Sequence, residues 1–254
     1  MKQQIFSCMS YNILYLKPDE QRLLRVVKSL QNASPDTFGL QEATPYWIEM
    51  LTRDLGNDYA FVGEGRDGGN KGEYSPVFYR KSKFNLLDSG TKWLSATPDE
   101  KASKFESSSM PRIFSYALLE SKADKSRYLH INTHLEHSNP TAREEQIEVL
   151  AAFARKHGEQ PILITGDFNS EYMHKPYAVL TANGFCDSAK IARVAQNTAR
   201  TFLGDIKTPV SFEKVIDFCF VKGVKQVTLY RVITDKINGE YPSDHLPVYT
   251  EFEL

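Results

Sequence analysis

The chain has 254 residues, a formal net charge of −1, and ordinary fractions of hydrophobic (41%) and charged (25%) residues. This composition predicts a folded globular protein that is long enough to bury a substantial core. The near-neutral charge argues against a protein that binds long DNA strongly, but it permits an enzyme whose charged groups face one cleft.

The N-terminal part of the chain is predicted to alternate strands with helices. Residues 19–31 carry apolar side chains at helical spacing, and Asp19 precedes most of them as a possible N-cap. Thr44 and Pro45 are typical of a helix start, and Gly56 marks the end of that second helix. Strands are expected before each helix, at Ile5–Tyr11 and Thr37–Leu40.

The rest of the chain is predicted to be rich in strands. Two further helices are expected at about Thr141–His157 and Lys175–Asn183. The strands are expected at Tyr59–Val62, Ser75–Tyr79, Phe84–Leu94, Ile113–Glu120, Tyr128–Thr133, Pro161–Thr165, Val215–Val221, Val224–Val232 and Leu246–Phe252. Since no repeat or linker interrupts the chain, we expect one domain over residues 1–254, with two sheets packed face to face and helices outside.

Two polar stretches, residues 64–73 and 95–110, are predicted to be long loops. Loops of this length in a compact domain are often functional, although a mobile surface is an equal alternative at this point. We expect them to shape a substrate pocket.

The compartment is predicted from the cysteines and the N-terminus. Cys8, Cys186 and Cys219 are far apart in the sequence, and they form neither a disulfide framework nor a CxxC metal motif. The N-terminus lacks the apolar run of a signal peptide, and no stretch is long enough to span a membrane. We therefore expect a cytoplasmic protein without a membrane partner.

Polar side chains follow or precede six of the apolar strands at corresponding ends. They are Asn12, Glu42, His134, Asp167 with Asn169, Asp217, and Asp244 with His245. Each residue alone is weak evidence for an active site, because an acid at a strand end is usually a cap or part of a solvated turn. Residues 166–169 also favour a tight turn for local reasons. Strand ends at one edge of a sheet can converge, so the combination favours an active site.

The chemistry of this set suits hydrolysis of phosphate esters, which needs a cation to neutralise the phosphate oxygens. Hard oxygen ligands such as Glu42, helped by Asn12, suit Mg²⁺, with Mn²⁺ as a possible substitute. Asp167 is expected to accept a proton from the attacking water, which Asn169 orients through its amide. Asp244 is expected to fix the tautomer of the neighbouring histidine and is also a candidate metal ligand.

The two histidines His134 and His245 are the expected donors to phosphate oxygens as charge builds. By contrast, His130, His157 and His174 have no comparable context and are expected to be structural or solvated.

In this order the motifs resemble those of the endonuclease/exonuclease/phosphatase superfamily, which has the DNase I-like fold. The resemblance runs from Met9-Ser10-Tyr11-Asn12 to Ser243-Asp244-His245-Leu246-Pro247, through Leu40-Gln41-Glu42 and Gly166-Asp167-Phe168-Asn169. It implies an α/β fold, a four-layered sandwich in which two packed, largely antiparallel mixed sheets are flanked by helices. It also implies Mg²⁺-dependent cleavage of phosphoesters at one edge of the paired sheets.

The resemblance further implies roles for single residues. Glu42 matches the metal-binding glutamate of the family, and Asn12 matches its metal-proximal asparagine. Asp167 and Asn169 match the pair that activates water and stabilises the oxyanion, and His134 matches a phosphate-binding histidine.

Three further matches involve acids, and one arginine is a candidate contact. Asp217 matches an acid that supports a site histidine, while Asp244 and His245 match the terminal aspartate–histidine pair. Glu73 stands where some members place a glutamate beside the first histidine. Arg112 is a plausible phosphate contact, although an exposed arginine is equally often only a surface charge.

The chain departs from the family pattern after His134. Many relatives have an aspartate or asparagine two residues later, whereas this chain continues Leu135-Glu136-His137. We expect His137 to be a loop residue rather than a ligand.

The substrate is the least determined part of the prediction. The spacing resembles compact bacterial members, and we expect a monomeric Mg²⁺-dependent phosphoesterase that attacks a phosphodiester or phosphomonoester in line with an activated water. The expected substrate is a small phosphorylated molecule or a short single-stranded RNA end. The alternatives are a DNA/RNA nuclease of broad specificity and a catalytically inactive binding module, which the complete residue set disfavours.

Overall fold

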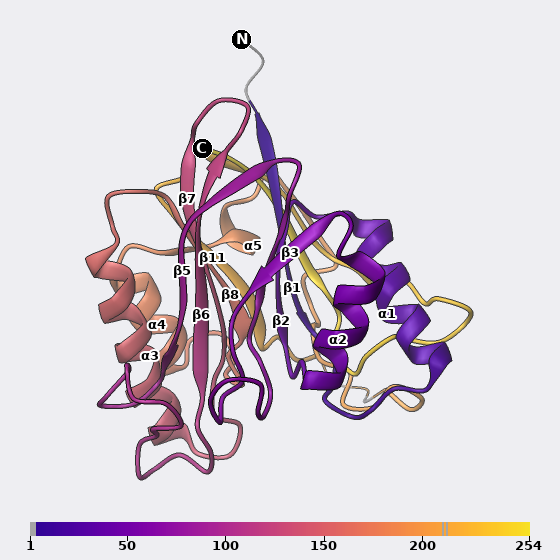
Figure 1. Ribbon diagram of the computed structural model, residues 1–254, viewed down its shortest axis with the longest axis horizontal. Coiled ribbons are helices and arrows are strands. Elements are labelled where there is room, and N and C mark those ends of the chain that lie inside the picture. The colour runs from indigo at the N-terminus through magenta and orange to yellow at the C-terminus, as the bar shows by residue number, and fades with distance from the viewer. Residues whose placement is uncertain (1–3, 210, 212) are drawn as a thin grey trace.

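The computed structural model describes residues 4–209, 211 and 213–254, which contain two mixed sheets (Figure 1). Among these residues the first sheet has seven strands in the order β10-β12-β13-β1-β2-β4-β3. They are β1 (Ile5–Asn12), β2 (Thr37–Gln41), β3 (Tyr59–Val62), β4 (Val77–Arg80), β10 (Val194–Gln196), β12 (Gln226–Val232) and β13 (Val248–Glu253). Within this sheet β1 is parallel to β2 and antiparallel to β13.

The second sheet has six described strands in the order β5-β6-β7-β8-β11-β9. They are β5 (Phe84–Trp93), β6 (Ile113–Ser121), β7 (Arg127–His134), β8 (Ile162–Asp167), β9 (Cys186–Asp187) and β11 (Asp217–Lys222). Only β7 and β8 pair in parallel in this sheet, and the other described pairs are antiparallel.

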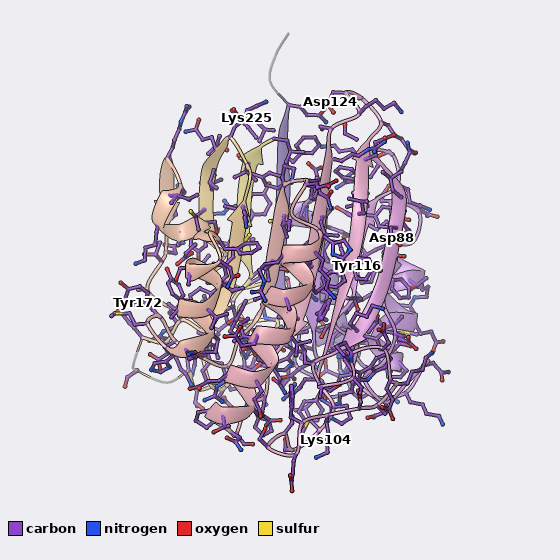
Figure 2. All side chains as sticks on the ribbon, turned by 90° about the vertical axis from the view of Figure 1, so that its left-hand side faces the viewer. Asp88, Lys104, Tyr116, Asp124, Tyr172 and Lys225 are labelled. Carbon is purple, nitrogen blue, oxygen red and sulfur yellow. The ribbon has the colours of Figure 1, made fainter. Side chains whose placement is uncertain are left out.

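Helices cover the outer face of each sheet. The helices α1 (Glu20–Ala33) and α2 (Pro45–Leu55) pack on the first sheet, and α3 (Pro140–Lys156) and α4 (Lys175–Ala182) pack on the second, as Figures 1 and 2 show from two sides. A short helix, α5 (Ser188–Ile191), follows β9. The predicted four-layered α/β sandwich is confirmed. None of the described helices has the length and apolarity that crossing a bilayer requires.

The inner core lies between the two sheets and is largely aromatic at the end distant from the predicted site. Phe6 and Phe252 of the first sheet meet Phe84 and Tyr128 of the second, with ring centroids 5.5 to 5.9 Å apart. The thiols of Cys8 and Cys219 are also buried here, with their Sγ atoms 3.4 Å apart and not bonded covalently.

A polar network joins the two sheets closer to the predicted site. Gln41 Nε2 donates to Asn132 Oδ1 at 2.7 Å, and Asn132 Nδ2 donates to the carbonyl oxygen of Leu40 at 2.7 Å. A Cβ atom on Gly39 would lie 2.2 Å from the Asn132 side chain, so only glycine permits this approach. The network holds β2 and β7 together next to Glu42, which follows β2, and His134, which ends β7.

The predicted elements are all present, with small differences at their ends. The strand expected at Ser75–Tyr79 begins at Val77, because Pro76 has no N–H group to donate to a ladder. The strand expected at Val215–Val221 begins at Asp217, which is the first residue of this segment to pair with β8.

Three elements were not predicted, namely β9, α5 and β10. They contain two, four and three residues, which is too short for a hydrophobic period to develop.

Both long loops are held by hydrogen bonds. In the loop of residues 64–73, the Arg66 N–H donates to the Glu73 carbonyl oxygen at 2.9 Å. In the loop of residues 95–110, Ser108 and Ser109 donate to the buried carboxylate of Glu136. Lys104 marks this second loop at the lower end of the molecule in Figure 2, opposite Asp124 and Lys225.

Candidate active site

The polar residues predicted at strand ends come together at one edge of the two sheets. Asn12 ends β1 beside Gln41 of β2, and Glu42 follows directly. His134 and Asp167 are register partners at the ends of β7 and β8, and Asp217 opens β11 opposite Asp167. The site is a pocket of about 460 Å³, lined by Tyr15, Glu42, Arg66, Glu73, Met110, Arg112, His134, His137, Asp167, Asn169, Phe202, Asp244 and His245.

Asn12 joins two of the acids. Its Nδ2 atom donates to Glu42 Oε1 at 3.1 Å and to Asp167 Oδ2 at 3.0 Å, and its Oδ1 accepts from the Leu14 N–H at 3.0 Å. The Tyr15 N–H donates to the other oxygen of Glu42 at 2.8 Å. Asn12 was predicted among the metal ligands, but its carbonyl oxygen is already bonded within the protein. A second lone pair of that oxygen keeps the predicted contact to a metal open, while the amide group holds Glu42 and Asp167 together.

Asn169 lies in a left-handed backbone conformation, with φ +46°, directly after Phe168. Its N–H donates to Asp167 Oδ1 at 2.8 Å, and its Nδ2 donates to the Leu135 carbonyl oxygen at 3.1 Å and to His134 Nε2 at 3.0 Å. Both protons of the amide thus have acceptors inside the protein. The predicted donation from Asn169 to water or phosphate requires one of these bonds to be exchanged.

The surroundings of His134 disfavour the charged form of its ring. Burial lowers the pKa of His134 well below its usual range, and the positive charge of Arg112 lowers it further. Its Nε2 atom accepts from Asn169 and lies 3.4 Å from Asp167 Oδ2. Because Nε2 accepts a hydrogen bond here, the predicted donation from His134 to phosphate requires this nitrogen to be protonated and its bond with Asn169 to be given up.

His245 is held by Asp217 rather than by Asp244. Its Nδ1 donates to Asp217 Oδ2 at 2.9 Å, and its Nε2 lies 3.7 Å from Asp167 Oδ2. Burial lowers the pKa of His245, but Asp217 and Asp167 outweigh this effect and raise it to about 10. The prediction that Asp244 orients the ring is wrong, because Asp217 takes Nδ1 and Nε2 points toward Asp167, while Asp244 Oδ1 accepts from the neighbouring Ser243 Oγ at 3.2 Å.

Glu73 makes an ion pair with Arg66, with Nη1 and Oε2 2.8 Å apart. Glu73 and His134 line the same pocket, so this pair with Arg66 adds to the predicted placement of Glu73 beside the first histidine and does not contradict it. Arg66 was not predicted as a site residue. The sequence shows that Arg66 lies in a glycine-rich loop, but it does not show that this loop borders a pocket.

Arg112 is a buried member of the site, only 4% exposed, and not a surface charge. Its Nη2 lies 3.1 Å from His137 Nδ1, and its Nε has no hydrogen-bond partner among the described residues. His137 lies in a loop as expected, and it also lines the pocket, where Nδ1 is 3.1 Å from Glu136 Oε1.

The remaining histidines lie outside the pocket. His130 is buried between Thr37 Oγ1 at 3.1 Å and Thr165 Oγ1 at 2.8 Å. His157 stacks near Phe153, and His174 is exposed at the N-cap of α4.

The donor set fits a hard divalent cation. Glu42 and Asp244 both line the pocket. Burial raises the pKa of Asp244, the charge of His245 lowers it, and the charge of Glu42 raises it again. Two carboxylates that repel each other at a pocket offer the oxygen ligands that Mg²⁺ prefers. A tighter group of Asp167, Asp217 and His245 also exists, but Asp217 and His245 Nδ1 are bonded to each other.

Comparison with known proteins agrees with this geometry. The family model described as the endonuclease/exonuclease/phosphatase family matches residues 9–245. Among curated proteins, none matches the chain at the sequence level.

Several solved structures are similar over nearly the whole chain. A mannosyl-6-phosphatase from Bacteroides thetaiotaomicron is 30% identical, with 98% of this chain and 100% of that chain covered and a TM-score of 0.91. A family member from the same organism is 29% identical, with 99% and 98% covered and a TM-score of 0.91. TDP2 from D. rerio, solved with a single-strand DNA product, is 20% identical, with 99% and 100% covered and a TM-score of 0.75, and shares the fold.

The family match covers most of the chain and runs from Met9 of the first predicted motif to His245 of the last. The chain therefore belongs to the endonuclease/exonuclease/phosphatase family and is an enzyme that hydrolyses phosphoester bonds.

Proposed function

We propose that this protein is a Mg²⁺-dependent phosphoesterase that hydrolyses a phosphate ester of a small molecule of the sugar-phosphate class. The observation that carries the proposal is one pocket that Glu42, Asp167 and Asp244 line together with Arg112. Carboxylates suit a metal and a proton acceptor, and a buried guanidinium suits phosphate. The pocket volume of about 460 Å³ is typical of small-molecule sites. The similar mannosyl-6-phosphatase supports the same substrate class.

Glu42 and Asp244 are the proposed ligands of Mg²⁺. When bound, the ion neutralises phosphate oxygens and stabilises the leaving alkoxide. Asn12 and the Tyr15 N–H hold the two oxygens of Glu42 in place, so this ligand needs little reorganisation to bind.

Asp167 is the proposed base for the attacking water. Asn12 Nδ2 and the Asn169 N–H fix its two oxygens at 3.0 and 2.8 Å. Burial, followed by the charge of Asp217, raises the pKa of Asp167. A carboxylate with a raised pKa accepts a proton from water more readily, which suits a general base.

His245 is the proposed donor to the phosphate oxygens. Because Asp217 holds its Nδ1, the charged ring presents Nε2 toward Asp167 and the pocket. Arg112 is the proposed second cationic contact to the phosphate. Its buried Nε atom has no hydrogen-bond partner among the described residues, so binding phosphate would break no bond of this atom. Both groups are positioned before substrate binds and can stabilise the negative charge of the transition state.

A short RNA end is the second candidate substrate. Tyr15 lines the pocket and is 51% exposed, which leaves an aromatic ring on which a base could stack. The inactive binding module, the other alternative from the sequence, is set aside because the chain belongs to a family of phosphoester hydrolases.

The test is phosphate release from mannose 6-phosphate, glucose 6-phosphate, bis-p-nitrophenyl phosphate and an RNA oligomer, with Mg²⁺ or Mn²⁺ and with excess EDTA. We expect release from a sugar phosphate that EDTA abolishes. Glu42→Gln should raise the Mg²⁺ concentration needed for half-maximal activity, whereas the matched control Glu49→Gln, at an exposed position of α2, should not. Full activity in EDTA would contradict the metal mechanism, and cleavage of RNA alone would contradict the substrate class.

The single domain, the monomeric state and the cytoplasmic location stay predictions. Limited proteolysis should yield no stable fragment if residues 1–254 form one domain, and gel filtration should give the mass of one chain.

A further inference from the structure

A second pocket, of about 310 Å³, lies beside the active-site pocket. It is lined by Pro140, Arg143, Glu144, Ser170, His174, Lys175 and Pro176. Asn169 lines the active-site pocket and Ser170 lines the second, and the Cα atoms of consecutive residues are only about 3.8 Å apart. Arg143 Nη1 also donates to the carbonyl oxygen of His137, a lining residue of the active-site pocket, at 3.1 Å. The two pockets are therefore neighbours.

The lining residues come from the first turns of α3 and α4 or lie just before α4. The two helices contain 17 and 8 residues, and both begin at this pocket. Helix N-termini carry a partial positive charge, which favours an anion. At α3 the Asn139 side chain already accepts from the Thr141 N–H, and both helices have a proline in the first turn, so the N–H groups that remain free lie mainly at α4. His174, the N-cap residue of α4, makes no side-chain capping bond to these groups.

The side chains add to the positive character of the helix ends. Arg143 and Lys175 are cationic, and Glu144 is the acidic residue of the lining. Lys175 and Glu144 are exposed, whereas Arg143 is half-buried and fixed by its bonds to the carbonyl oxygens of Glu136 and His137.

Ser170 supplies an observation that does not depend on the helix ends. The residue is 4% exposed, and its Oγ atom is buried without a hydrogen-bond partner among the described residues. A buried hydroxyl without a partner is unfavourable. An occupant of this pocket that carries acceptor oxygens would satisfy it.

We propose that this second pocket binds a phosphate group and that it is the subsite for a second phosphate of the substrate. Anion binding follows from the pocket alone, whereas the assignment to the substrate rests on the proposed function. The preferred substrate is then a bisphosphorylated small molecule, with one phosphate in each pocket.

The first experiment measures binding of inorganic sulfate by NMR of the histidine rings. His174 reports on the second pocket, while His134 and His245 report on the active site, so the two events are separate. His174→Gln identifies the reporting signal. We expect the His174 signal to shift with sulfate, and Lys175→Glu to weaken this binding about tenfold, because attraction becomes repulsion of similar size.

Lys156→Glu is the matched control, since it makes the same charge change at an exposed position at the other end of α3. An unshifted His174 signal at sulfate concentrations that saturate the active-site histidines would overturn the proposal. Equal weakening by Lys156→Glu and Lys175→Glu would also overturn it, because the effect would then be one of net charge. Ser170→Ala should weaken sulfate binding. Without sulfate it should raise the melting temperature, because it removes a buried hydroxyl that has no partner. A lowered melting temperature would mean that the hydroxyl is bonded and would contradict this observation.

The second experiment compares KM for glucose 1,6-bisphosphate and glucose 6-phosphate. Lys175→Glu should raise KM for the bisphosphate more than for the monophosphate, and Lys156→Glu should change their ratio little. If Lys175→Glu weakened sulfate binding but left the ratio of the two KM values unchanged, the substrate assignment would be overturned. The proposal of an anion site would still stand. Absence of turnover on any ester would overturn the proposed function, while the sulfate titration would still decide the anion site.

Discussion

Replacement of Glu136 by glutamine tests how the wall of the active-site pocket is held. The Glu136 side chain is fully buried, and its two oxygens accept bonds from Ser108 Oγ, from the N–H and Oγ of Ser109, and from the N–H and Oγ of Ser138, at 2.8 to 3.1 Å. These serines belong to the segments that carry Met110 and His137 to the pocket. Glutamine keeps the shape of the side chain but has one acceptor oxygen and no charge.

The expected loss follows from the pKa of Glu136. Burial raises this pKa, but the bonds from Ser138 and Ser109 outweigh burial and lower it from 4.5 to about 2. Because the folded value lies below the unfolded one, the stabilisation is complete above pH 4.5 and is lost as the pH falls through about 2. The difference amounts to roughly 3 kcal/mol of folding free energy, since one pKa unit is about 1.4 kcal/mol.

Urea denaturation at several pH values measures this quantity. Glu136→Gln should lower the free energy of unfolding by up to ~3 kcal/mol at neutral pH, and its difference from the parent protein should shrink between pH 4.5 and 2. Glu148→Gln, at an exposed position of α3, is the control and should change little. A difference from the parent that is the same at pH 7 and pH 2.5 would refute the electrostatic reasoning.

Three further predictions concern the site and the sheets. Asp167→Asn should lower kcat about 10³-fold with an unchanged melting temperature, and substantial activity would remove its role as base. Asp217→Asn should lower the pKa of His245 from about 10, as followed by NMR of its ring; an unchanged value would mean that Asp217 does not set it. Gly39→Ala should lower the free energy of unfolding by about 1–3 kcal/mol in urea, because the new methyl group meets Asn132, and a neutral result would contradict the close approach.

The fold was largely predictable because its helices and strands carry local signals. Asp19 caps α1 through a bond from the Arg22 N–H at 2.7 Å, and Thr44 precedes α2 at the expected position. The elements that escaped prediction depend on distant partners. The strand β10, for example, exists by pairing with β12, and its side chains are exposed and show no alternation.

The site was predictable as a set of positions, but its contacts were not. Strand ends identify Glu42 and Asp167 because the sheet edge brings them together. The resemblance implied that Asp217 supports a site histidine, but which histidine it contacts depends on the antiparallel register of β11 with β8, which no local pattern encodes. Arg66 escaped for a similar reason, since the Trp93 indole N–H, 2.7 Å from the Arg66 carbonyl oxygen, helps to place its loop.

The register that sets Asp217 opposite Asp167 also limits how such an enzyme can change during evolution. A one-residue insertion or deletion within β8 or β11 would turn one of these acids to the other face of the sheet and separate it from His245. Changes of length in residues 64–73 and 95–110 leave that register intact. These loops can therefore change in length without moving the two acids, while the acids themselves can change only by replacement at fixed positions.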